Sequence, residues 1–364
     1  MKCIQNDFQG LKPQYPVEEL CDINAALFID IETTGLYAKS SNLYMIGCAY
    51  YEADCWRSVQ WLAVNYDDEE NVLKAFAEFA APYRYLIHFN GNRFDIPYLT
   101  AKLEQYEISF DFSNLEGIDI YKRIAPYKSF LKLPDCKQKT IESFINISRE
   151  DTYSGGELID VYHDYVLTRD AEKEHFLLLH NEEDLRGMFD IISVLSVFDL
   201  FHKPVKVTKV QANYYKDSKQ NQKPEIIMNL KLPSALPVEI SYSANDCYFK
   251  GLGREGKLRV PIYEEEMKYF YSNYKDYYYL PKEDIALHKS VAAFVDKEYR
   301  RPAKARNCYT RKASSYLPQW DFVFTPFFKR DYDDKQIFFE LTDEFKTQRE
   351  SFNKYAQHIL NMML

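Results

Sequence analysis

The chain has 364 residues, of which 46% are hydrophobic and 28% charged, a usage typical of folded globular proteins. The length suits about two domains, and the composition excludes a disordered chain and a collagen-like fibre. No apolar run approaches the roughly 20 residues of a membrane helix, and the N-terminal segment lacks the apolar core of a signal peptide. We therefore expect a folded protein of the cytoplasm.

Charge is distributed unevenly along the chain. The formal net charge is -9, which argues against a uniformly basic nucleic-acid-binding protein. Residues 205–364 contain 27 Lys and Arg against 21 Asp and Glu, a net charge of +6, whereas residues 1–204 contain 19 against 34, a net charge of -15. An acidic half therefore precedes a mildly basic one. The seven cysteines are widely spaced and never form C-x-x-C, so we expect free thiols.

The first half of the chain alternates short apolar runs with longer helical patterns. After an N-terminal extension of residues 1–23, short apolar runs bounded by turn residues predict strands at 26–35, 42–52, 56–64, 85–90 and near 117–122. The i, i+3, i+4 pattern predicts helices at 67–83, 94–106 and 182–201. Three strands, a helix and another strand indicate a mixed α/β sheet. This domain is expected to span residues 24–204.

The second half is polar and punctuated by prolines. Consecutive strands with turn signals between them are predicted at 206–215, 224–232, 237–245, 247–252 and 257–265. Residues 281–306 are expected to be helical as far as Pro302, and residues 343–364 to form a closing helix. We therefore expect residues 205–364 to form a smaller, β-rich α+β domain with a helical end.

An apolar strand carries the first pair of candidate catalytic residues. Asp30 and Glu32 stand two positions apart in the strand that ends in Thr33-Thr34-Gly35, so their side chains point to the same face. Two like charges on one face repel each other, and Mg²⁺ or Mn²⁺ would neutralise them. The alternative is a strand end with two solvated acids.

The second element is the segment His88–Leu99, where a strand runs through a turn into a helix that begins with Asp95. An Asp at this position is commonly just a helix cap. The Asn90-Gly91-Asn92 turn, however, allows close approach of the backbone to a ligand, and Phe94 could stack on a base.

The third element is His180-Asn181-Glu182-Glu183-Asp184, at the start of the long predicted helix. His180 and Asp184 lie one turn apart, so the imidazole and the carboxylate can face one site, the first as a base and the second as a metal ligand. Glu183 and Asp190 have a less suitable helical phase. A surface pair of side chains is the plainer interpretation.

In order and spacing, these three elements resemble the motifs of the DEDD superfamily of 3′–5′ exonucleases, which has an RNase H-like fold. The sequence is similar in particular to the YprB-like predicted exonucleases, through E-T-T-G from Glu32, H-F-N-G-x-x-F-D from His88 and H-N-x-x-D from His180. The resemblance covers residues 24–202. It implies an RNase H-like mixed five-stranded sheet flanked by helices.

The resemblance also implies a mechanism. Two Mg²⁺ or Mn²⁺ ions would be held by Asp30, Glu32, Asp95 and Asp184, with Asp30 between them, and would clamp a phosphoryl displacement. His180 would deprotonate or orient the attacking water, although a spacing of four before the last Asp is that of the family's Tyr subclass. The product would be a nucleoside 5′-monophosphate cut from a 3′ end of single-stranded RNA or DNA. Substrate contacts are expected from Thr33, Gly35, Asn90, Asn92 and Phe94.

The acidic catalytic half needs a second surface to hold phosphates. Residues 297–312 contain seven Lys and Arg and one Glu, together with Tyr299 and Tyr309, a combination that suits single strands. A solvated helix face explains them equally well. Lys139 and Arg149 are further candidates to face the substrate.

Two other functions fit the same residues. The chain could be a nucleic-acid-binding or scaffold protein on an exonuclease-like fold, or an endonuclease of the RNase H-like class. Choice of sugar depends on contacts with the 2′-hydroxyl, which motif spacing does not predict.

Overall fold

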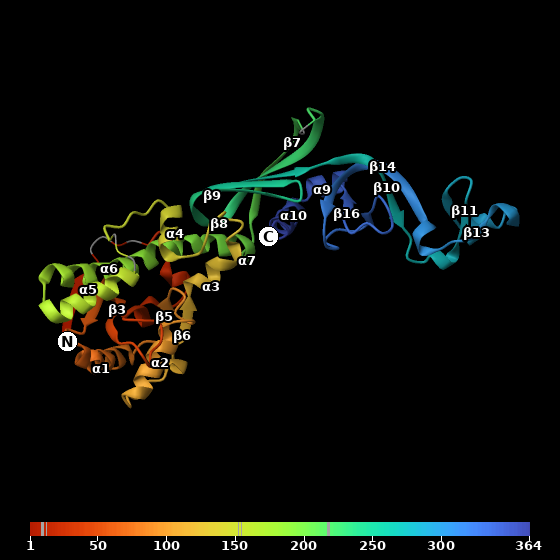
Figure 1. Ribbon diagram of the computed structural model, residues 1–364. Helices are drawn as coiled ribbons and strands as arrows, with labels where there is room; N and C mark the ends of the chain where they lie inside the picture. The colour runs from red at the N-terminus through yellow and green to blue at the C-terminus, as the bar shows by residue number, and fades with distance from the viewer. Residues whose placement is uncertain (9–10, 12, 152, 154, 217–218) are drawn as a thin grey trace. The chain divides into compact units, whose positions relative to one another are not determined.

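The computed structural model describes residues 1–8, 11, 13–151, 153, 155–216 and 219–364 (Figure 1). It contains two units, of which the first comprises Met1–Asp199 and Ser234–Val238, and the second Leu200–Pro233 and Glu239–Leu364. Among the described residues no helix is long and apolar enough to cross a membrane. All seven cysteines are free thiols, as the sequence predicts.

A mixed six-stranded sheet forms the centre of the first unit. Its order is β1-β4-β3-β2-β5-β6, and its strands are β1 (Lys2–Asp7), β2 (Ala26–Thr33), β3 (Leu43–Glu52), β4 (Cys55–Leu62), β5 (Tyr85–His88) and β6 (Glu116–Asp119). β5 and β6 run parallel to β2, and the other pairs are antiparallel. The sheet has one strand more than the sequence predicts. The additional strand is β1, an edge strand that is exposed on both faces and therefore lacks an apolar run.

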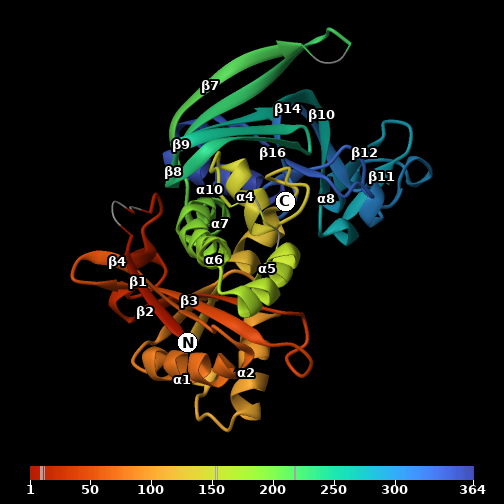
Figure 2. The ribbon, with the colours of Figure 1, turned by 60° about the vertical axis from the view of Figure 1, so that its left-hand side comes forward.

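Helices cover both faces of this sheet (Figure 2). On one face lie α1 (Glu69–Ala80) and α2 (Asp95–Gln105). On the other lies α6 (Ala171–Ile191), which packs against α4 (Gln138–Phe144) and α5 (Gly155–Thr168). Two short helices, α3 (Ile120–Ile124) and α7 (Leu195–His202), follow β6 and α6.

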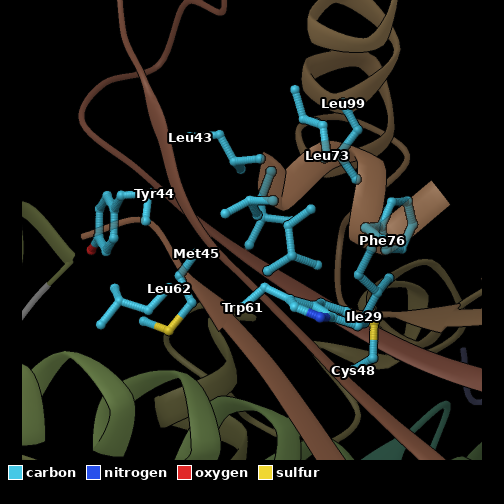
Figure 3. Close-up of a cluster of buried hydrophobic side chains, with 14 of the residues drawn as sticks. Ile29, Leu43, Tyr44, Met45, Cys48, Trp61, Leu62, Leu73, Phe76 and Leu99 are labelled. Carbon is cyan, nitrogen blue, oxygen red and sulfur yellow. The ribbon is translucent and has the colours of Figure 1, made fainter. Parts of the chain in front are cut away.

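The alternation of side chains along β2 separates the core from the site. Ile29 lies in the hydrophobic cluster with Leu73 and Phe76 of α1 and Leu99 of α2 (Figure 3). Phe28 points the other way, with its ring centroid 4.1 Å from that of Phe189 on α6. Because side chains in a strand alternate, Asp30 and Glu32 share the face of Phe28 and turn toward α6.

The second unit is rich in β-structure, as predicted. Its three sheets are β7-β8-β9, β10-β14-β16-β15 and β12-β11-β13. Their strands are β7 (Lys206–Lys216), β8 (Gln222–Ala244), β9 (Cys247–Pro261), β10 (Tyr263–Phe270), β11 (Tyr277–Leu280), β12 (Ile285–His288), β13 (Arg301–Pro302), β14 (Tyr309–Gln319), β15 (Phe327–Phe328) and β16 (Ile337–Glu340). The closing helix is present as α9 (Asp343–Thr347) and α10 (Arg349–Asn361).

Two predictions for this half are wrong in detail. Residues 224–245 and 247–265 do not form four short strands, because β8 continues through Pro233 and β9 continues through Gly253, which bends the chain with φ +55°. Residues 281–306 form the strands β12 and β13 and a four-residue helix α8 (Lys289–Ala292) instead of one helix. Pairing of β11 with β12 and β13 overrides the helical propensity of this segment.

Candidate active site and metal centre

Three elements of the first unit bring four carboxylates together. Asp30 and Glu32 come from β2, Asp95 is the first residue of α2, and Asp184 lies on α6. Burial raises the pKa of Asp30 well above its ordinary range, and the charges of Asp184, Glu32 and Asp95 raise it further. Burial and the charges of Asp184 and Asp95 do the same for Glu32. The four predicted carboxylates therefore share one electrostatic environment.

His180 lies between two of these carboxylates. Its Nε2 is 3.7 Å from Oε1 of Glu32 and 3.4 Å from Oδ2 of Asp184. One ligand atom from each of the three residues lies within 4.8 Å of the other two. The spacing of His180 and Asp184 by one helical turn thus places both side chains at the same point.

Asp95 is the buried carboxylate at the start of α2. Burial raises its pKa to about 7, although hydrogen bonds from backbone amides, including that of Ile31, lower it; the charges of Asp119 and Asp184 add to the rise. Asp95 does not act as a side-chain cap, since the residue before the helix is Phe94 and makes no side-chain capping bond.

These residues fit a divalent cation. The carboxylates of the site repel one another and resist ionisation. A bound cation would offset their repulsion and favour their ionised forms. Carboxylate oxygens are the ligands that Mg²⁺ and Mn²⁺ prefer, and an imidazole is compatible with Mn²⁺. Asp30, Glu32, Asp95 and Asp184 could hold such ions.

Asp151 contacts the second ring nitrogen of His180, Nδ1. Its Oδ2 lies 2.6 Å from Nδ1 of His180 and 3.0 Å from Nζ of Lys139. Although burial alone would raise the pKa of Asp151, hydrogen bonds from Lys139 and the Tyr153 amide, together with His180, keep it below its ordinary range. An ionised Asp151 accepts a hydrogen bond from Nδ1–H, which leaves Nε2 as the unprotonated nitrogen that faces Glu32 and Asp184.

Arg149 fixes the position of Asp184. Its Nη1 lies 2.6 Å from Oδ1 of Asp184, and its Nε and Nη2 donate to the two carboxylate oxygens of Glu142 at 2.5 Å and 2.6 Å. Arg149 is nearly buried. Both Lys139 and Arg149 therefore contact acids of the site rather than presenting free cations to a substrate.

Asn181, also on α6, holds the carboxylate of Asp30. Its Nδ2 donates to Oδ2 of Asp30 at 2.8 Å, and its Oδ1 accepts from Nε2 of Gln60 at 2.9 Å. Asn181 is completely buried against Gly47, the residue that pairs with Asp30 on β3. A Cβ atom at position 47 would lie 1.9 Å from Oδ1 of Asn181, so this contact requires glycine.

The five predicted substrate residues occupy two turns. At the end of β2, Thr33 donates from Oγ1 to the carbonyl of Gly35 at 2.9 Å. After β5, the amide of Asn90 donates to Oδ1 of Asp119 at 3.0 Å, and Asn90 has φ +61°. Asn92 is exposed, whereas Phe94 is half-buried with its ring centroid 5.6 Å from that of Tyr98.

Sequence reasoning missed Asp151 and Asn181 and assigned Arg149 a different role. Asn181 interrupts the buried stripe Leu177, Leu185 and Met188 of α6, and a polar residue in such a stripe is a usable signal of a buried hydrogen bond. Asp151 and Arg149 lie between α4 and α5, in a segment without periodicity, so tertiary contacts alone give them their roles.

One family of known proteins matches the first half of the chain. A family model described as the RNase_H superfamily matches residues 27–196. A search of curated proteins gave no match.

Solved structures that resemble the chain do so at low identity. The family B DNA polymerase of the hyperthermophilic archaeon Pyrobaculum calidifontis is 12% identical, with a TM-score of 0.37, over 69% of this chain and 35% of the polymerase. A nuclease in its apo form is 16% identical, with a TM-score of 0.31, over 51% of this chain and 78% of that one. Exonuclease I of E. coli in complex with a dT13 oligonucleotide is 11% identical, with a TM-score of 0.28, over 56% of this chain and 54% of that one.

The chain thus spans about a third of the polymerase and about half of exonuclease I. The family match and the mixed sheet of the first unit together assign an RNase H-like fold to residues 27–196.

Proposed function

We propose that this protein is a divalent-metal-dependent 3′–5′ exonuclease that releases nucleoside 5′-monophosphates from single-stranded nucleic acid. One observation carries the proposal: Asp30, Glu32, Asp95 and Asp184 lie near enough for their charges to act on one another, and His180 lies between Glu32 and Asp184. The match to the RNase_H superfamily supports a nuclease. The motifs shared with the YprB-like exonucleases support the direction of cleavage.

His180 is proposed as the general base. Asp151 accepts a hydrogen bond from its Nδ1–H, so Nε2 is free to accept a proton from water at the side of the carboxylates. Arg149 and Asn181 position Asp184 and Asp30 before substrate arrives. Such preorganisation reduces the rearrangement that reaction would otherwise require.

Two Mg²⁺ or Mn²⁺ ions, when bound, would neutralise the four carboxylates and polarise the scissile phosphate. In the proposal, Asp30, Glu32, Asp95 and Asp184 hold them. Thr33, Gly35, Asn90, Asn92 and Phe94 are proposed to contact the 3′ end of the strand, in the two turns that follow β2 and β5.

The test uses short 5′-labelled single strands of RNA and DNA with Mn²⁺, Mg²⁺ or EDTA. Wild type is compared with Asp30→Asn and Asp184→Asn, and Asp164→Asn, an exposed acid of α5, is the matched control. We expect a metal-dependent ladder that shortens from the 3′ end in wild type and in the control and is absent from the two site variants.

A circular single strand separates exonuclease from endonuclease, because it offers no end. Cleavage of the circle at the rate of the linear strand would overturn exonuclease action in favour of an endonuclease. Binding of strands without shortening in any metal would favour a nucleic-acid-binding or scaffold protein.

A further inference from the structure

The sheet β7-β8-β9 of the second unit carries a groove lined by basic residues. Its volume is about 760 Å³, and four cations line it, from β8 and β9: Lys231, Lys250, Arg254 and Lys257. Glu255 is the one acid among the lining residues. The groove therefore presents a local excess of positive charge in a chain that is acidic overall.

Several of these cations are available to a ligand. Within the part of the chain that the structure describes, Lys231 and Lys257 form neither an ion pair nor a side-chain hydrogen bond. Arg254 donates to the carbonyl of Pro233 at 2.7 Å, and its other guanidinium donors remain for a ligand. Lys250 pairs with Glu239 at 2.9 Å.

In the basic segment 297–312, several cations have partners within the unit. Arg306 pairs with Asp333 and Lys312 with Glu340, both at 2.6 Å. Arg311 pairs with Asp284, and Arg300 donates to a backbone carbonyl. Four of the seven cations in this segment are thus engaged within the unit, compared with Lys250 and Arg254 among the four of the groove.

The floor of the groove is packed. Gly256 brings the backbone of β9 close to β8, since a Cβ atom there would lie 2.9 Å from Leu232 and 3.4 Å from Leu230. Both leucines are buried. This packing fixes the spacing of the two strands that carry the cations without a ligand, so binding does not require their backbones to rearrange.

Further exposed lysines continue along the same sheet. Lys206 and Lys209 on β7 and Lys223 on β8 are exposed, and the pairing of β7 with β8 places them on the face of Lys231. None of the three forms an ion pair among the described residues. Lys216, which pairs with Gln222, lies on the other face. The cations therefore follow the strands as a track. A track of separate charges suits a polyanion with repeated charges better than a single small anion.

We propose that this basic groove binds the phosphate backbone of single-stranded nucleic acid. The identity of the strand as a substrate rests on the proposed function, because the first half of the chain has a net charge of -15 and would repel phosphates without such a surface. No aromatic residue is among those that line the groove. Binding should therefore be independent of sequence, since phosphate contacts carry no base information.

Affinity is measured with fluorescent poly(dT) and poly(U) oligonucleotides, on full-length Asp30→Asn protein in EDTA, over a series of salt concentrations. The test variant adds Lys231→Ala and Lys257→Ala, two exposed side chains without partners, so the fold is not put at risk. The matched control adds Lys297→Ala and Lys304→Ala, two exposed lysines of the other basic segment.

We expect the groove variant to bind at least about tenfold more weakly and its salt dependence to fall by about 1.4 in logarithmic slope, since each phosphate contact on a single strand accounts for about 0.7. The control should match its parent. An equal loss in both variants, no loss in the groove variant, or competition by polyglutamate as strong as by nucleic acid would overturn the proposal.

These outcomes are independent of catalysis. Groove-dependent binding without any cleavage by the wild-type protein would contradict the proposed function and leave the groove as a binding site. Cleavage by wild type, together with unchanged binding in the groove variant, would contradict the basic groove as a binding site and leave the proposed function standing.

Discussion

At the scale of single residues, Asp151 decides which nitrogen of His180 is basic. The Asp151→Asn variant keeps the shape of the side chain but loses the charge that fixes the imidazole. We expect kcat to fall by about 10- to 100-fold with KM nearly unchanged, as for other residues that orient a catalytic group. Steady-state kinetics on a single-stranded substrate measures both constants.

Two comparisons distinguish positioning from folding in this experiment. Asp151→Glu retains a carboxylate and should recover part of the loss in kcat, whereas a purely structural role would give equal losses for both variants. Asp164→Asn, at an exposed acid that pairs with Lys173, should leave both constants unchanged. An unaltered kcat in Asp151→Asn would contradict the role of Asp151.

Asp95 makes stability depend on pH in the absence of metal. Since its pKa is raised to about 7 in the folded protein, the folded state binds more protons than the unfolded state between the ordinary Asp range and neutral pH. The resulting stabilisation is complete at low pH and is lost as pH rises through about 7.

In Asp95→Asn this loss disappears. Between about pH 5 and about pH 8 in EDTA, the free energy of unfolding of wild type should fall by about 2 kcal/mol more than that of Asp95→Asn. Urea titrations across this range measure the difference. Identical slopes in the two proteins would show that Asp95 is ionised at ordinary pH in the folded state.

At the scale of elements, the contact of β3 with α6 depends on Gly47. A Cβ atom at this position would overlap Asn181 and break its hydrogen bond to Asp30. We expect Gly47→Ala to lower the free energy of unfolding by about 1 to 3 kcal/mol and to reduce nuclease activity by at least about tenfold. Denaturant titration and the strand assay measure the two effects.

A double variant isolates the cause. Asn181→Ala removes the hydrogen bond and also makes room for the added methyl group, so Gly47→Ala in that background should cost little further stability or activity. Fully additive losses would mean that the effect of Gly47→Ala does not pass through Asn181.

The elements that sequence reasoning predicted well are those with strong periodicity. β2 and β3, with α1 and α2, follow clear apolar patterns, and alternation along β2 correctly placed Asp30 and Glu32 on one face. β1 was missed because an edge strand exposed on both faces has no such pattern. The prediction of a helix at 281–306 was wrong because the pairing of β12 and β13 with β11 outweighed the local helical propensity.

In the candidate site, too, the residues that lie in periodic elements were predicted better than those that lie between elements. Spacing predicted that Asp30 and Glu32 share one face of a strand and that His180 and Asp184 share one face of a helix. That these elements meet, together with Asp95, was expected only from the resemblance to the DEDD exonucleases. Arg149 and Asp151 lie between α4 and α5, where no offset constrains direction, and their contacts with Asp184 and His180 arise on folding. The predicted roles of Thr33, Gly35, Asn90, Asn92 and Phe94 stay predictions.

At the scale of the whole molecule, metal binding should raise the thermal stability of the first unit. Trp56 and Trp61 lie in the first unit and Trp320 in the second, so a Trp320→Phe variant reports on the first unit by fluorescence. Mn²⁺ at about 100 times its dissociation constant should stabilise that unit by about 2.7 kcal/mol, because the ion binds the folded state. Thermal unfolding with and without Mn²⁺ measures the shift.

Adding Asp30→Asn to this variant provides the control. The shift should disappear or shrink in it, since Asp30 is a proposed ligand. A shift of equal size in both proteins would place the Mn²⁺ elsewhere on the chain.

Glu183 ties residues 150–151, which follow α4, to α6. Its two carboxylate oxygens accept from the amides of Glu150 and Asp151 at 2.8 Å and 2.9 Å. Those two amide hydrogens can exchange with solvent only when residues 150–151 leave the helix, and the same opening removes Arg149 and Asp151 from the site. Their exchange rates therefore count how often the contacts of Arg149 and Asp151 with Asp184 and His180 come apart in the resting protein.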